Sequence, residues 1–172
     1  MPNPQLLTDK SRLQEIYDLR VEAYEHSPKS VYVNRKIFPN GWFDNLDNWE
    51  STRHWVVTDN DKIIAAARIT VLNVVKDTGE DFDKFELPGE RPFAYWSRLV
   101  VHPEYRKTSA MLKIDHARKR FMLDNPQVKF ALCCVTPDRS KSLLRIGFNH
   151  LGEFMYNWGG RIEQVVSAYI FL

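Results

Sequence analysis

Residues Ala94 to Leu123, AYWSRLVVHPEYRKTSAMLKIDHARKRFML, contain the pattern that decides the fold of this chain. The first third is typical of an apolar strand, and a turn with Pro103 and a basic loop with Arg106 and Lys107 follow it. Apolar residues at helical spacing then predict an amphipathic helix over 108–123. The first amides of a helix have no partner within it and lie at its partially positive end. The unit therefore predicts a site for a phosphate or pyrophosphate.

The residues around this unit predict a mixed sheet with helices on its faces. A first helix is expected from Asp9 to about Glu25, and two apolar runs joined by a turn at 59–61 predict a β-hairpin. Residues 75–92 are acidic and contain Gly and Pro, so we expect a surface loop there. After the second helix, the pattern predicts a buried strand at 129–136, a short helix that ends at Gly147, and two last strands. This order is typical of one α/β (α+β) domain over residues 1–172.

Composition excludes several classes of function. The chain has 172 residues, of which 44% are apolar and 27% charged, with a net charge of +2. This charge gives no reason to expect binding to nucleic acid or to a membrane, and no apolar run approaches the roughly 18 residues of a membrane span. The N-terminus lacks the apolar core of a signal peptide, and the adjacent Cys133 and Cys134 are expected to be buried thiols. We therefore expect a cytoplasmic protein without a metal site.

Two local patterns resemble those of the GNAT acyltransferase superfamily: LVVHPEYR leading into a helix, and LLRIGF followed by a short strand. The resemblance implies a single GNAT-like domain with a mixed central sheet and splayed fourth and fifth strands. It implies an N-acetyltransferase that moves an acetyl group from acetyl-coenzyme A, as co-substrate, to an amine of a small molecule or peptide. Homodimerisation is possible within such a family.

The resemblance also implies a binding site for the coenzyme. The end of the fourth strand pairs its main chain with the pantetheine arm, and the basic loop binds the pyrophosphate. Ser109 and Met111 stand where the family pattern has glycine or alanine, which would permit close approach of the backbone. The residues implied in coenzyme binding are Leu99, Val100, Val101, Arg106, Lys107, Thr108, Ser109, Ala110 and Met111.

Catalytic residues are not assigned by the resemblance. Many relatives have a tyrosine four residues before the glycine of the "GF" pair, where this chain has Leu143, and their usual glutamate is missing from FAYWSRLVV. Transfer to an amine needs an oriented thioester and stabilisation of the oxyanion, which main-chain N–H groups can provide. A domain of this fold that binds coenzyme A or a partner protein without catalysis is an alternative.

The chain also resembles, in part, the acyl-homoserine-lactone and N-acyl amino acid synthases, which take acyl groups from acyl carrier protein. Their pattern has an Arg on the third strand, a Phe in an acidic loop, and a Trp-Glu-x-Ser-Arg-Phe sequence on the fourth strand. Here Arg68, Phe85 and residues 95–99 correspond, without the Glu. Acyl carrier protein is acidic and would need a basic docking surface. The candidates for this surface are Lys107, Lys113, Arg118 and Lys119.

Three arginines are candidates for substrate binding: Arg20, Arg68 and Arg98. An arginine within a sheet is costly unless it is paired. One interpretation is a buried salt bridge of Arg68 and Arg98 with Glu22 or Asp18, and the other is a grip on a carboxylate of the acceptor. The aromatic residues between 24 and 43 either form an acceptor pocket or anchor their loop to the core. His102 is expected to be a turn residue rather than a base.

Overall fold

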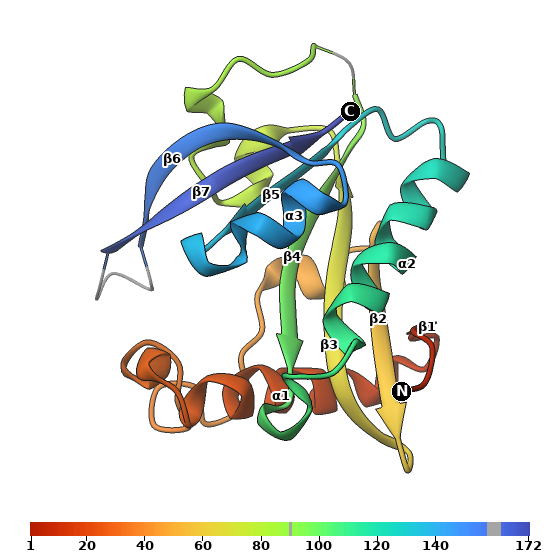
Figure 1. Ribbon diagram of the computed structural model, residues 1–172, viewed down its shortest axis with the longest axis vertical. Coiled ribbons are helices and arrows are strands. Elements are labelled where there is room, and N and C mark those ends of the chain that lie inside the picture. Colours follow the sequence, from red (N-terminus) through yellow and green to blue (C-terminus); the bar gives the residue numbers. More distant parts are fainter. Residues whose placement is uncertain (90, 158–162) are drawn as a thin grey trace. The chain divides into compact units, whose positions relative to one another are not determined.

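Seven strands form one mixed sheet in the computed structural model, which describes residues 1–89, 91–157 and 163–172 (Figure 1). Strand β4 pairs in parallel with β5, whereas the pairs β1–β2, β5–β7 and β6–β7 are antiparallel. This arrangement confirms the predicted mixed sheet. In spatial order the strands are β1 (Gln5–Leu6), β2 (Thr52–Asp59), β3 (Lys62–Leu72), β4 (Phe93–Val101), β5 (Ala131–Val135), β7 (Glu163–Phe171) and β6 (Asn149–Asn157).

Three α-helices accompany these strands in the described part of the chain. Helix α1 spans Leu13–Glu25, α2 spans Ala110–Asp124 and α3 spans Ser140–Arg145. A 3₁₀ turn, Lys10–Arg12, precedes α1, and the Asp9 carboxylate caps it by accepting from the Ser11 amide at 2.9 Å. The predicted helices are therefore confirmed, with shifts of a few residues at their ends.

Close contacts group the described residues into two compact units. The first unit comprises Met1–Arg68 and Arg98–Arg118, and the second comprises Ile69–Ser97 and Lys119–Leu172. Strands β3 and β4 contribute residues to both units, as does helix α2. The extent of one domain over residues 1–172 stays a prediction.

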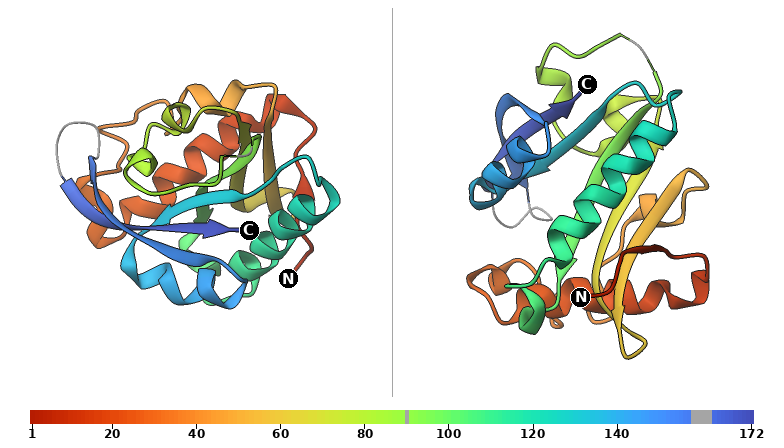
Figure 2. Two further views of the ribbon diagram at one scale, coloured as in Figure 1. Left: turned by 90° about the horizontal axis from the view of Figure 1, so that it is seen from above. Right: turned by 45° about the vertical axis from the view of Figure 1, so that its right-hand side comes forward.

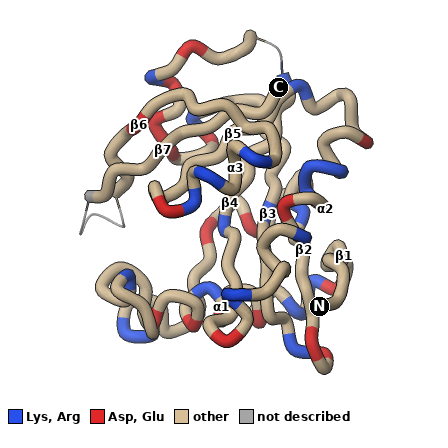
Figure 3. The backbone as a smooth tube through the Cα atoms, viewed as in Figure 1, with Lys and Arg blue, Asp and Glu red and all other residues tan. Residues whose placement is uncertain are grey.

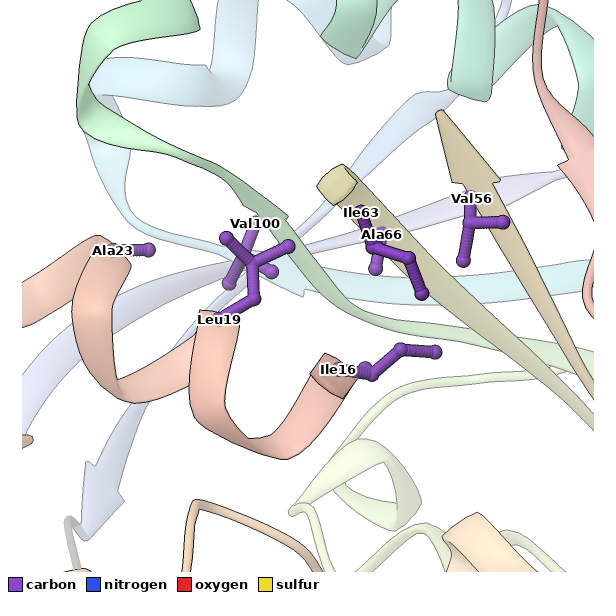
Figure 4. Close-up of a cluster of buried hydrophobic side chains, with 7 residues drawn as sticks. All are labelled: Ile16, Leu19, Ala23, Val56, Ile63, Ala66 and Val100. Carbon is purple, nitrogen blue, oxygen red and sulfur yellow. The ribbon is translucent and has the colours of Figure 1, made fainter. Parts of the chain in front are cut away.

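The core of the first unit lies between α1 and the strands β2, β3 and β4 (Figure 4). Helix α1 contributes Ile16, Leu19 and Ala23, which recur at helical spacing and so share one face. They pack against Val56, Ile63, Ala66 and Val100. Because side chains alternate along a strand, the neighbours of Val100 in β4 point to the opposite face, and both are only half-buried.

The hairpin β2–β3 turns at Asn60 and Asp61, as the sequence predicts (Figure 2). Their φ angles are +46° and +66°. Two successive residues with positive φ match a tight turn whose twist suits the two strands, and Asn and Asp tolerate this conformation better than most residues.

Most of the described residues in 75–92 are exposed or half-buried, as expected of a surface loop, but aromatic side chains anchor the segment in a way that the sequence does not indicate. Two 3₁₀ turns, Val75–Thr78 and Phe82–Lys84, form there, and the Phe82 side chain is fully buried against Phe154 at a centroid distance of 5.7 Å. Nearby, the ring of Phe85 lies so close to Gly152 that a Cβ added there would be 2.6 Å from its Cε1 atom. The alternation of charged residues with single aromatics hid these anchors, because no helical or strand period marks them.

Basic and acidic segments are interspersed along the chain in Figure 3. Among the described residues, no group of His, Cys, Asp and Glu is arranged to hold a metal ion. None of the helices in the same part of the chain combines the length and the apolar character needed to cross a membrane.

Candidate active site

The end of β4 carries an unusual backbone conformation. Parallel pairing with β5 runs from Ala94–Ala131 to Trp96–Cys133, and β4 continues beyond it to Val101. Just after the last of these pairs, Arg98 has a φ of +55°. For a residue with a Cβ, the left-handed region costs about 1–2 kcal/mol, so its surroundings must hold Arg98 in place.

Arg98 belongs to a group of five charged residues, which we call the Arg–Asp network. Arg20 donates to both oxygens of Asp47, at 2.7 and 2.8 Å, and Arg68 Nη1 donates to Asp47 at 2.8 Å and to Asp44 at 2.5 Å. Arg98 donates through Nε and Nη2 to Asp44 Oδ2, at 2.9 and 2.7 Å. Three cations and two anions leave a formal charge of +1. The structure therefore brings all three predicted substrate-binding arginines together.

The two carboxylates of the network come from one short turn. The 3₁₀ turn Asn45–Asn48 has a capping box, in which Asp44 accepts from the Leu46 amide and Asp47 accepts from the Asp44 amide. These mutual hydrogen bonds fix both side chains on the same side of the turn. Because a turn of this kind is local, the pattern DNLD could have indicated the cap, but it gives no sign of the arginines that pair with it.

The loop before this turn is fastened to helix α1. Gly41 has a φ of +83°, and a Cβ there would be 2.6 Å from the Cβ of Tyr17. The Trp42 amide donates to the Tyr17 carbonyl at 2.9 Å, and Arg20 Nη1 donates to the Trp42 carbonyl at 3.0 Å. Glycine is therefore needed at 41 for this close approach, which places the network beside α1.

The prediction that Arg68 and Arg98 pair with Glu22 or Asp18 is wrong. Asp18 accepts from Arg35 at 2.5 Å, and Glu22 lies 3.0 Å from Nε2 of His102. His102 also accepts from the Glu104 amide at 3.3 Å, which confirms it as a turn residue. The capping turn supplies the counter-charges instead, and helical spacing along α1 gives no sign of it.

Burial and charge shift the titration of this site. Burial acts to raise the pKa of Asp47, but Arg20 and Arg68 outweigh it and hold that pKa well below its ordinary value. Burial, with the nearby charge of Arg20, lowers the pKa of His54 to about 4. His54 Nε2 lies 3.2 Å from the Asp47 carbonyl, and its buried Nδ1 has no hydrogen-bond partner among the described residues. His54 is therefore neutral at pH 7.

Aromatic residues hold the outer part of the network. The Arg98 guanidinium lies 4.2 Å from the centroid of the Trp42 ring, within the range of a cation–π interaction. Trp42 is buried and packs edge-on against Tyr24 and beside Phe38, whereas Phe43 is 54% exposed. This packing favours the interpretation in which Trp42 anchors its loop.

The predicted phosphate loop, residues 106–111, has some of its donors engaged within the chain. The Arg106 guanidinium donates to the Ala23 carbonyl at the end of α1. Thr108 Oγ1 donates to the Tyr105 carbonyl at 2.6 Å and accepts from the Ala110 amide at 3.3 Å, which caps the start of α2. Lys107 and Ser109 are exposed. The loop has the predicted position, and its role in coenzyme binding stays a prediction.

The expected basic docking surface needs a correction. Arg118 is fully buried and donates to Asp115 at 2.5 Å, one turn earlier on α2. Lys113 Nζ donates to the Met1 carbonyl at 2.6 Å, and Lys119 Nζ donates to the Ile146 carbonyl at 2.8 Å. Only Lys107 of the four is exposed. Consecutive basic residues on a helix point in different directions, so the sequence run does not make a patch.

The model of the acetyltransferase (GNAT) family matches residues 13–148. No curated protein matches the sequence. ElaA from Escherichia coli has a similar structure, with a TM-score of 0.68, 16% identity and 100% of both chains covered.

Two synthases are also similar in fold. BjaI, a CoA-dependent acyl-homoserine lactone synthase solved with SAM and isopentyl-CoA, gives a TM-score of 0.74 at 12% identity, covering 99% of this chain and 83% of that one. LasI, another acyl-homoserine lactone synthase, gives 0.68 at 18% identity, covering 97% and 88%. At these identities the likeness concerns the fold alone.

Proposed function

The chain belongs to the acetyltransferase (GNAT) family, and we propose that it moves an acetyl group from acetyl-coenzyme A to an amine of a small molecule or peptide. The observation that carries this proposal is the unit of β4, basic loop and α2. Leu99 and Val101 lie on the half-buried face of β4, and the loop leads into the first turn of α2. The helix N-terminus and the exposed Lys107 favour an anionic ligand there.

The main chain of β4 would provide the chemistry. Leu99, Val100 and Val101 can pair with an extended pantetheine arm through main-chain groups, since their side chains are not required for it. A main-chain N–H directed at the thioester oxygen would stabilise the charge that develops there during transfer. No side chain is assigned as acid or base.

The Arg–Asp network would lie on the acceptor side. Its formal charge of +1 and its outermost arginine, Arg98, whose side chain is 18% exposed, favour an acceptor that carries a carboxylate. Arg20 and Arg68 are exposed by 1% or less, so they would act by holding Asp44 and Asp47 in position for Arg98.

Turnover and binding with acetyl-coenzyme A test the proposal. We expect release of free thiol when a panel of amines and amino acids is supplied, and a rise in melting temperature on adding acetyl-coenzyme A. Arg106→Ala should weaken that rise, whereas Arg120→Ala, an exposed arginine later on α2, should not. The absence of any shift with acetyl-, longer acyl- or free coenzyme A would contradict the proposal. Binding without turnover would instead indicate a non-catalytic domain.

A second candidate is transfer of a longer acyl group, with acyl carrier protein as donor. The observation that favours it is that Arg68 and Arg98 both form ion pairs with Asp44. These two arginines belong to the pattern on which the partial resemblance to the synthases rests. Faster turnover with acyl carrier protein loaded with a medium acyl chain than with acetyl-coenzyme A, lost at high salt, would favour this candidate. Turnover with acetyl-coenzyme A alone would exclude it.

A further inference from the structure

We propose that Asp44 and the Trp42 ring form a clamp that holds Arg98 in its left-handed conformation and so directs the main-chain amides after it, beginning with Leu99, toward the thioester. In this account Asp44 is a positioning residue, because it acts on the reacting atoms only through Arg98. The inference rests on the proposed function for its catalytic part and on the structure alone for its conformational part.

Arg98 has a backbone conformation that is unusual for its residue type and its place in a strand. Among the described residues, three that are not glycine have a positive φ: Asn60, Asp61 and Arg98. The first two lie in a tight hairpin turn and belong to residue types that tolerate this region. Arg98 lies inside a strand and has a long side chain, so neither reason applies to it. Its conformation must be stabilised by the contacts of that side chain.

The guanidinium of Arg98 is held by a carboxylate and by an aromatic ring. Two guanidinium nitrogens of Arg98, Nε and Nη2, donate to the same oxygen of Asp44, and the guanidinium lies over the Trp42 ring at 4.2 Å. Paired donors and a flat ring together restrict a guanidinium in both direction and plane. The side chain of Arg98 is thereby fixed to the loop that precedes the 3₁₀ turn.

Asp44 and Trp42 are themselves held in place by hydrogen bonds. Asp44 caps the 3₁₀ turn through the Leu46 amide and accepts from Arg68, which is 1% exposed. Trp42 is tied to α1 through both its amide and its carbonyl. A carboxylate and a ring held in this way can resist the relaxation of Arg98 to negative φ.

The substitutions Arg98→Ala and Arg98→Gly distinguish the role of the side chain from the role of the backbone conformation. Arg98→Ala and Arg98→Gly both remove the guanidinium, so both should raise the acceptor KM to a similar extent. Glycine adopts positive φ without cost, however, and alanine does not. We expect kcat of the glycine variant to exceed that of the alanine variant about tenfold. Equal kcat values for the two variants would overturn the inference.

Asparagine at 44 tests the clamp from the other side. Asn is as good an N-cap as Asp, so Asp44→Asn keeps the 3₁₀ turn but weakens the contact with Arg98. We expect kcat to fall about tenfold in the native background and less than twofold in the Arg98→Gly background. The matched control is Asp9→Asn, the same exchange at the exposed cap before α1, which should leave kcat unchanged. An equal effect of Asp44→Asn in both backgrounds would contradict the clamp.

The conformational part has a measurement that needs no turnover. A strong cross-peak between the amide proton and Hα of residue 98 in NMR spectra marks positive φ. This signal should be present in the native protein, where residue 98 has a single Hα, and lost in Asp44→Asn. If no donor supports transfer, the proposed function fails, but the spectra still test whether Asp44 holds Arg98 at positive φ. Persistence of the signal in Asp44→Asn would contradict the clamp.

Discussion

Arg20 and Asp47 form an ion pair from which water is excluded, since both side chains are 0% exposed. Arg20→Met replaces the guanidinium with an apolar side chain and leaves part of the Asp47 charge uncompensated. We expect the free energy of unfolding to fall by about 3 kcal/mol, measured by denaturant unfolding. Arg120→Met is the control, because Arg120 pairs with Asp124 on the surface, with exposures of 77% and 55%. Its effect should stay below about 0.5 kcal/mol, and equal losses would contradict this account.

His54 makes stability depend on pH. Its pKa is about 4 in the folded protein against 6.5 in an unconstrained chain, so the unfolded state binds more protons between these values. The contribution is therefore complete above pH 6.5 and is lost as the pH falls toward 4, by about 3 kcal/mol in total. Unfolding measured at a series of pH values should show this slope.

The substitution His54→Gln keeps an N–H donor and removes the titration. It should flatten the stability profile between pH 6.5 and pH 4, while His116→Gln, at an exposed position of α2, should leave the slope as it is. A slope that persists in His54→Gln would assign the effect to other groups.

At the scale of elements, the missing side chain of Gly41 allows its loop to approach α1 closely. Gly41→Ala adds a Cβ 2.6 Å from Tyr17 Cβ in a backbone with φ of +83°. We expect a loss of about 3 kcal/mol, from strain and overpacking together. Gly79→Ala separates the two, since Gly79 has a φ of +72° but open space around it. Gly79→Ala should lower the free energy of unfolding by about 1 kcal/mol in the same assay. A similar loss at both positions would show that the close contact with Tyr17 does not contribute.

Elements with a local signal could be predicted from the sequence. The hairpin turn at Asn60 and Asp61 and the amphipathic faces of α1 and α2 follow from spacing and turn chemistry. The 3₁₀ turn that buries Phe82 could not be predicted, because a single aromatic in an acidic run has no period. The burial of Arg118 could not be predicted either, because its partner Asp115 lies in a charged stretch that is typical of a solvent-exposed helix face.

At the scale of the whole molecule, ligand binding should raise stability by mass action. At acetyl-coenzyme A concentrations a hundredfold above Kd, the gain is about 2.7 kcal/mol. For a chain of this length, such a gain corresponds to a rise in melting temperature of roughly 5–10 °C. A thermal scan with and without ligand measures it, and desulfo-coenzyme A is the control that shows whether the acetyl thioester contributes. A rise that does not depend on ligand concentration would exclude specific binding.

The candidate site could be predicted only in part, because its members are distant in sequence. Arg20, Arg68 and Arg98 could be recognised in the sequence as charges in apolar surroundings. Their partners Asp44 and Asp47 lie in a segment with no regular period. Pairing across so many residues depends on how α1, the loop and the strands pack. The local cap in DNLD was the one available signal, and it indicates a turn rather than a counter-ion.

The close approach of Phe85 to Gly152 has a consequence for the evolution of this chain. Gly152 lies in the β6 bulge with a φ of +153°, and the Phe85 ring occupies the space that any larger residue would need. The two positions are therefore expected to change together among homologues. Sequences that have acquired a side chain at 152 should have exchanged Phe85 for a smaller residue, and a large ring at 85 should be inherited only with glycine. An alignment of relatives can test this covariation.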